Sequence, residues 1–359
     1  MSADMAQLSS QQVARTTPVR HWIESPGYDL AFFTLSPLLG LAWLLTAPSE
    51  LSILIVLAIL GIPHYLSTFM FYFWEDNHLY HRSRWIAFFA GPVGIVLLVV
   101  ALVSGRVPYI LQLAVYFWNA YHVARQSCGI LSIYRHRAGV FDLRQKALAN
   151  TAIIASNGCL ATWNLTWHPI LYHPLSLLTP ALPRVIQLSL AGVSVVALLR
   201  LGLALWQRRN NGQAPGLSEM SFLCTSLLLF HPYLWVRDGS QATTGMLIGH
   251  FLQYLGIVWL LHRRKFTRRT RSGTPAWLVY LSSHTGMLLL VFLVSAGVYL
   301  ALKRLFTLFS LTIAFDSALF MLVIIHFYLD RFFWAFKEPH IRKSMGPYLM
   351  AHASGAAVS

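Results

Sequence analysis

Charged residues are scarce in this chain of 359 residues, since only 11% are Asp, Glu, Lys or Arg. A soluble domain usually carries about 25% charged residues. The hydrophobic share is 56%, the aromatic share is 14% and the mean hydropathy is +0.57. This balance excludes a nucleic-acid-binding protein, a secreted disulfide-rich scaffold and a soluble Rossmann or barrel enzyme. It favours a polytopic membrane protein, because apolar runs of about 20 residues recur along the whole sequence.

Cysteine is also rare, and no cleavable signal is evident. Cys128, Cys159 and Cys224 all fall inside apolar runs, so neither a disulfide framework nor a zinc knuckle is expected. The first 27 residues are polar and contain no apolar core, which predicts a short soluble leader. We expect three regions: a cytoplasmic leader over 1–27, a transmembrane helical domain over 28–333 and a cytoplasmic tail over 334–359.

The apolar runs predict an all-α bundle of ten membrane-spanning helices. Only a helix satisfies all of its own backbone hydrogen bonds in lipid, so each run is assigned to one helix. The spans are expected at 28–46, 51–74, 85–104, 108–134, 145–163, 184–206, 218–238, 241–261, 275–301 and 307–333.

Lysine and arginine are divided unevenly between the two sides of these spans. Twenty fall on the side that both termini and the even-numbered loops share, and five fall on the other: Arg106, Arg184, Arg237, Lys303 and Arg304. Because cytoplasmic loops are enriched in Lys and Arg, both termini are expected in the cytoplasm, in a bacterial-type inner membrane. The net charge of +15 then reflects basic loops beside anionic membrane lipids and not a nucleic-acid partner.

Histidine, in contrast, is abundant, and six of the 15 fall inside the predicted spans: His64, His122, His231, His250, His284 and His326. Their positions along the spans place all six roughly 12–20 Å from the cytoplasmic surface, at 1.5 Å per residue. Polar side chains in lipid are costly and usually face a cavity or a partner. Histidines that merely pack in a core are not expected to share one depth, so we predict a common site.

Four further polar residues lie three or four positions after one of these histidines, on the same helical face: Arg125, Gln126, Gln253 and Asp330. We take them as candidate catalytic residues, with Gln126, Gln253 and Asp330 orienting the imidazoles. Pro63 directly precedes His64 and frees a carbonyl group nearby. Broken helices at membrane depth usually line a cavity, which supports a site here.

An imidazole-rich site with few carboxylates suits iron, copper or zinc. Zinc hydrolysis requires a general base, and only Asp330 lies near the predicted depth. Copper is disfavoured because no Met or Cys cluster accompanies the histidines. Redox iron acting on an apolar substrate fits best, since the ligands lie where a lipid chain would enter. Six histidines suffice for one iron with a position open for O₂, or for two metals.

Two other functions remain open at this point. Two histidines on facing helices are able to ligate a haem, which would be b-type because no CxxCH motif is present. A proton-coupled transporter would use histidine, Asp330 and Arg125 as a relay. Transporter folds commonly contain internal repeats, and this sequence shows none.

The segments GIPH (61–64) and YHVARQ (121–126) resemble the Brp/Blh family of polytopic bacterial membrane proteins, which includes β-carotene 15,15′-dioxygenases. That family has a Gly-x-Pro-His segment on an early span. An aromatic-His segment follows it at about the spacing that separates His64 from His122 in this chain. The resemblance covers about residues 55–130 and implies that His64 and His122 ligate iron.

The chain departs from this family at two places. Tyr65 follows the first histidine, where the family favours glycine. The family also pairs two histidines four residues apart on a later helix, whereas in this chain Trp235 and Tyr254 stand four residues after His231 and His250. The sequence nevertheless favours a membrane non-haem iron oxygenase acting on an apolar lipid, isoprenoid or carotenoid, with its oligomeric state open. The expected ligands are His64, His122, His250 and His326, with His231 and His284 completing the site or holding a second metal.

Overall fold

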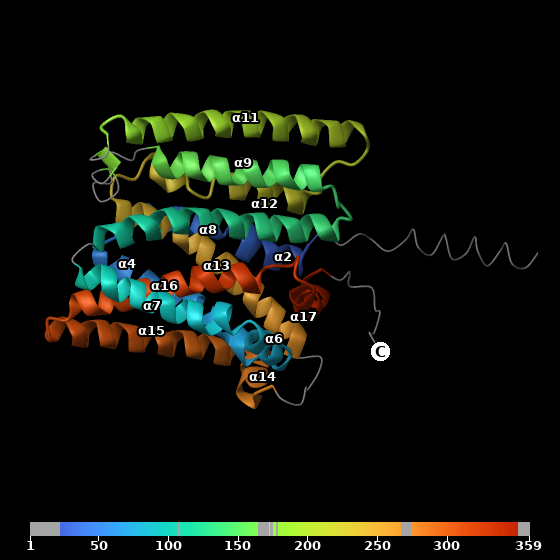
Figure 1. The fold of residues 1–359 in the computed structure, drawn as a ribbon. Helices are drawn as coiled ribbons and strands as arrows, with labels where there is room; N and C mark the ends of the chain where they lie inside the picture. Colours follow the sequence, from blue (N-terminus) through green and yellow to red (C-terminus); the bar gives the residue numbers. More distant parts are fainter. Residues whose placement is uncertain are drawn as a thin grey trace, which may run out of the picture.

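The computed structural model describes residues 22–105, 108–163, 172, 175–176, 179–266 and 274–350. All regular structure in these residues is helical, and Figure 1 shows long helices lying side by side in one bundle. The helices of the first half are α2 (Pro26–Asp29), α3 (Ser36–Leu44), α4 (Glu50–Val56), α5 (Ile62–Phe69), α6 (His78–Ser83), α7 (Gly91–Ser104), α8 (Pro108–Arg137) and α9 (Leu143–Thr162). Those of the second half are α11 (Leu182–Asn210), α12 (Leu217–Leu227), α13 (Gly239–Phe266), α14 (Ala276–Ser283), α15 (Thr285–Leu308), α16 (Thr312–Phe333) and α17 (Pro339–Leu349).

The described part of the chain contains six helical segments that are long and apolar enough to cross a membrane: Glu50–Phe73, Ile86–Ser104, Leu182–Asn210, Gly239–Phe266, Leu289–Leu308 and Thr312–Phe333. The bent pair Pro26–Thr34 and Ser36–Leu44 adds a seventh if it forms one span. The predicted all-α membrane architecture is therefore confirmed. The count of ten spans remains a prediction. Helices α8, α9 and α12 do not combine the length, the apolar content and the low charge that the six segments share.

The predicted span boundaries need correction where helices break. The span expected over 218–238 ends as α12 at Leu227 and continues only as a 3-10 turn, η7 (His231–Leu234). The span expected over 275–301 is interrupted at His284, between α14 and α15. Both breaks fall at segments that combine serine, histidine, proline or glycine with apolar residues, where hydropathy alone does not show the end of a helix.

Three π-helical turns in the described residues each precede a helix with proline in its first turn. They are η1 (Leu30–Thr34) before Pro37, η2 (Leu57–Gly61) before Pro63 and η5 (Ile86–Ala90) before Pro92. Proline lacks an N–H group and its ring crowds the preceding turn. The wider π turn accommodates the ring without breaking the helix, so α4, η2, α5 and the turn η3 (Met70–Phe73) form one continuous segment.

Helix α13 is the centre of the bundle and packs against α3, α5, α14 and α17. Its contact with α3 is a close backbone approach: a methyl group at Gly40 would overlap the carbonyl oxygen of Gly245. A methyl group at Gly249 would press on Pro37 at 3.0 Å. Small residues allow helices to approach in this way in membranes. On the other side of the bundle, α9 packs between α8 and α11, which forms an outer layer in Figure 1.

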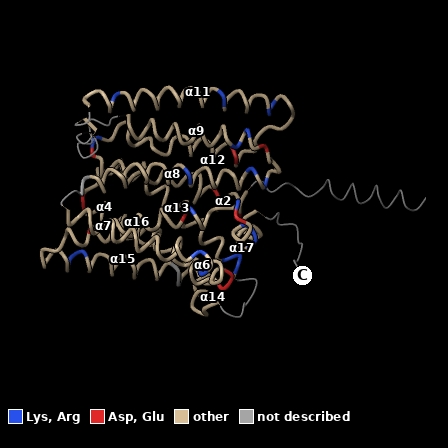
Figure 2. The backbone as a smooth tube through the Cα atoms, in the orientation of Figure 1, with Lys and Arg blue, Asp and Glu red and all other residues tan. Residues whose placement is uncertain are grey.

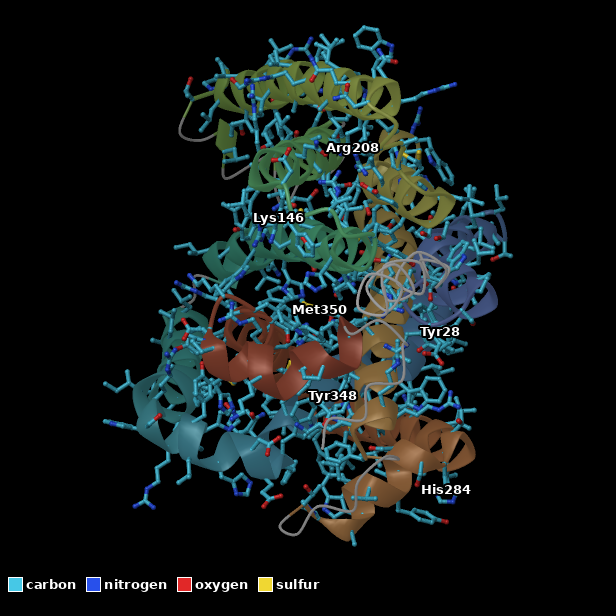
Figure 3. The ribbon with its side chains drawn as sticks, turned by 90° about the vertical axis from the view of Figure 1, so that its right-hand side faces the viewer. Tyr28, Lys146, Arg208, His284, Tyr348 and Met350 are labelled. Carbon is cyan, nitrogen blue, oxygen red and sulfur yellow. The ribbon has the colours of Figure 1, made fainter. Side chains whose placement is uncertain are left out.

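Charged residues are frequent at the end of the bundle where α6 and α17 lie, as the colours of the backbone in Figure 2 show. Arg135 and Arg208 both donate to Glu219 Oε1 at 2.8 Å, which ties the ends of α8, α11 and α12 together. Figure 3 looks onto this end, with Tyr28, Lys146, Arg208 and Tyr348 of four different helices facing the viewer. Part of the predicted C-terminal tail is thus built into the bundle as α17, in which Ile341, Met345 and Leu349 are buried.

Candidate metal centre

Four helices each contribute one histidine to the interior of the bundle. His64 lies on α5, His122 on α8, His250 on α13 and His326 on α16. Their exposed fractions are 0%, 8%, 1% and 0%, so all four are shielded from the surroundings. Because the four come from separate helices, only the tertiary packing brings them to one place.

Each of the four imidazole rings lies against two of the others. The ring centroid of His64 lies 4.5 Å from that of His326 and 4.7 Å from that of His250. The centroid of His122 lies 5.0 Å from His326 and 5.3 Å from His250. One ring nitrogen each of His64, His122 and His326 lies within 4.8 Å of the other two. The convergence expected from their common depth is therefore confirmed for these four histidines.

Aromatic side chains form the walls of this cluster. His122 stacks on Phe327 at a centroid distance of 4.4 Å, and His64 packs against Phe251 at 4.8 Å and Tyr254 at 4.5 Å. The π turn η2 directly precedes α5 and therefore sets the rotation of the helix that carries His64. The walls limit the motion of the imidazoles and keep water from the centre of the cluster.

Most ring nitrogens of the cluster lack a hydrogen-bond partner in the structure. Both nitrogens of His64 and His250, and the Nε2 atoms of His122 and His326, are buried without one. Buried polar groups are nearly always hydrogen-bonded, and leaving one unsatisfied costs about 1–3 kcal/mol. Several such atoms at one point require a common explanation. A bound cation is the simplest one, because it turns unpaired nitrogens into ligands.

Asp330 is the acidic residue of the cluster, one helical turn after His326 on α16. Its Oδ2 atom lies 3.9 Å from His122 Nε2 and 3.8 Å from His326 Nε2. Its Oδ1 atom accepts hydrogen bonds from Tyr254 at 2.7 Å and from Thr68 at 3.1 Å. One carboxylate oxygen is thus held by hydroxyl groups while the other faces the same point as the imidazoles.

Thr68 also fixes the orientation of His326. Its Oγ1 atom lies 2.7 Å from His326 Nδ1. Because the Thr68 hydroxyl donates to Asp330 Oδ1, its oxygen accepts the proton of His326 Nδ1. This assignment leaves the His326 Nε2 lone pair free and directed into the cluster. Hydrogen bonds of this kind to the remote nitrogen are typical of metal-binding histidines.

The predicted glutamines lie next to the cluster and bond to backbone carbonyls. Gln126 Nε2 donates to the carbonyl oxygen of His250 at 3.1 Å, and Gln253 Nε2 donates to that of Phe33 at 2.9 Å. Both therefore position helices and do not bond directly to an imidazole. Arg125 is exposed on α8, whereas His122 on the same helix is buried, so the structure does not bring Arg125 into the cluster.

His231 and His284 lie outside the cluster, which corrects the prediction of a six-histidine site. His231 is in the turn η7, where its Nδ1 accepts from Trp235 Nε1 at 3.3 Å. His284 is exposed at the break between α14 and α15, and Figure 3 shows it at the edge of the bundle. Both positions coincide with helix breaks, which the assumption of continuous spans did not include.

Three residues that hold the cluster were not among the predicted site residues. Thr68 and Tyr254 each stand four positions after a cluster histidine, so helical spacing would have found them. Trp334 stands four positions after Asp330, and its Nε1 lies 3.5 Å from the Tyr254 hydroxyl. All three contribute hydroxyl or indole donors to the hydrogen-bond network around Asp330.

Fold and site together define a helical protein of membrane type with a buried cluster of four histidines and one aspartate. A comparison with protein-family models, curated proteins and solved structures finds no match to this chain.

Proposed function

We propose that His64, His122, His250 and His326 bind one iron ion, and that the protein is a membrane non-haem iron oxygenase acting on a lipid or isoprenoid. The observation that carries this proposal is the set of unpaired ring nitrogens in the buried cluster, together with the approach of one ring nitrogen each of His64, His122 and His326 to within 4.8 Å of one another. Imidazoles with a single carboxylate form a donor set that iron accepts readily. The ion would supply redox chemistry with O₂. The chain supplies the ligands, the dry aromatic walls and the hydroxyl groups that hold Asp330.

The resemblance to the Brp/Blh family agrees with this proposal. His64 and His122, the two positions that the resemblance identifies, lie in one cluster although they are on separate helices. Where the family has a second histidine after His250, this chain has Tyr254, whose hydroxyl bonds to Asp330. We propose that His326 of α16 supplies the imidazole that the family takes from that position.

The two alternatives fit the site less well. A haem requires a flat macrocycle between its axial histidines, but the four rings here already touch, with centroid distances of 4.5 to 5.3 Å. A proton relay through Arg125 would need that side chain in the interior, and it is exposed. Zinc shares the donor set with iron, and metal analysis distinguishes the two.

Metal content of the purified protein tests the proposal directly. We expect iron in the wild-type protein and its loss in His326→Ala, because this change removes a ligand. His231→Ala and His284→Ala are matched controls, since the same residue type is removed outside the cluster. They should keep the wild-type iron content.

Iron that persists in His326→Ala, or is lost equally in the controls, would refute the assigned ligand set. An optical spectrum of the same samples separates the alternatives. A Soret band would indicate haem, and protein that folds without any metal would favour the relay.

We also propose ten spans with both termini in the cytoplasm of a bacterial-type inner membrane. The uneven distribution of Lys and Arg supports this orientation. A reporter fused after Met350 should be active only in the cytoplasm. Activity restricted to the periplasm would reverse the orientation, although the cluster itself would be unaffected.

A further inference from the structure

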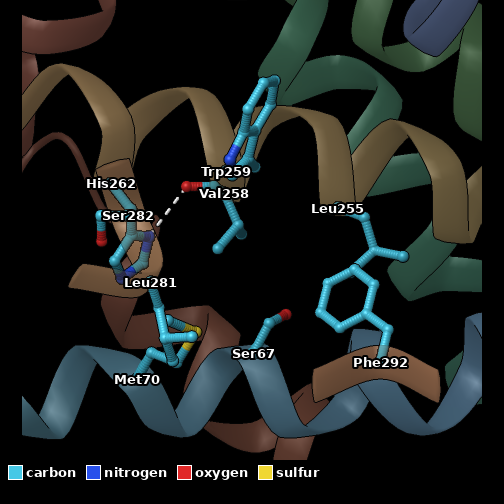
Figure 4. Close-up of a pocket in the computed structure, with 9 residues that line it drawn as sticks. All are labelled: Ser67, Met70, Leu255, Val258, Trp259, His262, Leu281, Ser282 and Phe292. Carbon is cyan, nitrogen blue, oxygen red and sulfur yellow. Dashed lines mark hydrogen bonds between the residues drawn. The ribbon is translucent and has the colours of Figure 1, made fainter. Parts of the chain in front are cut away.

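A second site lies beside the histidine cluster, in a cavity between α5, α13, α14 and α15. The empty space between its walls is about 310 Å³ when the part that is open to the surroundings is counted, and Figure 4 shows its nine lining residues. Most of the lining is apolar, including Leu255, Val258 and Phe292. Apolar cavities with a few polar groups are the usual form of small-molecule sites.

One polar group in this cavity lacks a partner. The Nε1 atom of Trp259 is buried without a hydrogen bond, and its indole nitrogen faces the cavity in Figure 4. An indole N–H is only a donor, so its partner must be an acceptor. His262, the neighbouring aromatic, cannot serve, because its Nδ1 bonds to the Val258 carbonyl and its Nε2 accepts from Trp74.

Two serine hydroxyl groups also line the cavity and are available to a ligand. Ser67 donates its proton to the His64 carbonyl at 2.7 Å, and Ser282 donates to the Leu278 carbonyl at 2.6 Å. Both hydroxyl oxygens therefore retain lone pairs as acceptors. A ligand hydroxyl satisfies both needs, since it accepts from Trp259 and donates to a serine, whereas a carbonyl oxygen can only accept.

The cavity is also placed for a ligand that extends toward the cluster. Ser67 is adjacent to Thr68, and Leu255 is adjacent to Tyr254, so two of the four helices that carry the cluster, α5 and α13, also line the cavity. Trp259 lies about 13 Å from His250 along the α13 axis, at 1.5 Å per residue. A chain anchored at Trp259 would present an interior carbon, not its terminus, to the cluster.

We infer that this cavity binds the hydroxyl end of a long apolar alcohol, with Trp259 donating a hydrogen bond to the alcohol oxygen. The identity of this alcohol as the substrate rests on the proposed function, while its binding does not. An alkane of the same length would leave the indole N–H unpaired and should bind roughly tenfold more weakly.

The test compares hexadecan-1-ol with hexadecane for binding to the full-length protein in detergent. We expect the wild-type protein to prefer the alcohol about tenfold, and Trp259→Phe to lose this preference, because the ring remains without its donor. Trp277→Phe is the matched control, since Trp277 is an exposed residue of α14 outside the cavity, and should keep the preference. Leu281→Trp should weaken the binding of both probes by filling the cavity.

Equal affinity of the two probes for the wild-type protein, or an unchanged preference in Trp259→Phe, would overturn the inference. Iron is measured on the same samples. Preference for the alcohol in protein without iron would sustain this site while refuting the oxygenase. A normal iron content without any preference for the alcohol would refute this site while sustaining the oxygenase.

Discussion

Helices α13 and α11 are nearly equal in length, with 28 and 29 residues, but their surroundings differ. The most apolar window of α13 is 89% buried inside the protein, and that of α11 is only 17% buried. The buried helix is nevertheless the less apolar of the two, because it carries His250, Gln253 and Tyr254. In a membrane the most apolar surface faces lipid, so the polar residues mark the interior.

Glycine substitutions should show the largest difference between these two environments. Gly40 of α3 touches the backbone of α13, and Gly40→Ala would drive its methyl group into the carbonyl oxygen of Gly245. We expect destabilisation of about 3 kcal/mol or more, because backbone atoms cannot move aside as side chains do. Thermal unfolding in detergent measures the change.

The matched control for this substitution is Gly202→Ala on α11. A methyl group there meets no atom within 4 Å, so stability should stay the same or rise slightly. Similar losses in both variants would show that α11 is packed as tightly as α13, and the comparison would fail.

Thr68→Val tests whether the hydroxyl network on the buried side tunes the cluster. Valine keeps the shape of threonine but removes the partner of His326 Nδ1 and one donor to Asp330. We expect metal affinity to fall roughly 10–100-fold, which is the usual effect of losing such a bond. Titration of the metal-free protein with ferrous iron gives the affinity. Ser67→Ala removes a neighbouring hydroxyl that bonds only within its own helix, and should leave the affinity unchanged.

Buried histidine at the charged end of the bundle makes stability depend on pH. Burial lowers the pKa of His81 from 6.5 to about 4, with His340 and His78 adding to the shift. The folded state therefore binds fewer protons than the unfolded chain between these values. The contribution of neutral His81 to the free energy of unfolding is fully present above pH 6.5 and is lost as the pH falls toward 4. At pH 5 the loss should be about 2 kcal/mol, from 1.36 kcal/mol per pKa unit.

His81→Leu should remove this part of the acid sensitivity. Unfolding temperatures at pH 8 and pH 5 should differ less in the variant than in the wild type, after correction for its stability at pH 8. An identical pH dependence in both proteins would mean that His81 is protonated in the folded state, despite its contacts with Phe88 and Phe333.

The smallest expected effects on iron binding concern Gln126 and Arg125, which lie on two different faces of α8. Gln126→Ala removes a hydrogen bond to the His250 carbonyl and should weaken iron binding several-fold, at the low end of the range for such contacts. Arg125→Ala changes an exposed side chain and should leave iron content unaltered. A loss of iron in Arg125→Ala alone would contradict the rotation of α8 described here.

The sequence predicted the helices better than it predicted which residues meet. The span expected at 85–104 corresponds to the helical segment Ile86–Ser104, because apolar composition and length define a helix locally. The depth argument correctly selected His64, His122, His250 and His326. It also selected His231 and His284, since the helix breaks beside them depend on tertiary packing that no local pattern reveals.

The rotation of each helix was the part that periodicity alone did not determine. Arg125 and Gln126 are adjacent in sequence and were assigned to one polar face, but only Gln126 contacts α13. Asp330 was expected to orient ligands, and the structure shows its second oxygen facing two imidazoles as well. Such roles depend on where neighbouring helices place their donors, which is information that a single helix does not contain.

The π turn η2, Leu57–Gly61, has a consequence for how this protein tolerates changes in length. A π turn holds one residue more than the α-helical path requires, so deleting one residue there would restore a regular helix. Because the extra residue is confined to the turn, α4 and α5 would keep their present rotation, and His64 would keep its neighbours. Deletion of one residue from the regular helix α5 after His64 would instead rotate the residues that follow by about 100°, at 3.6 residues per turn, and would turn Thr68 away from His326. The π turn is therefore the place where this segment tolerates the loss of a residue.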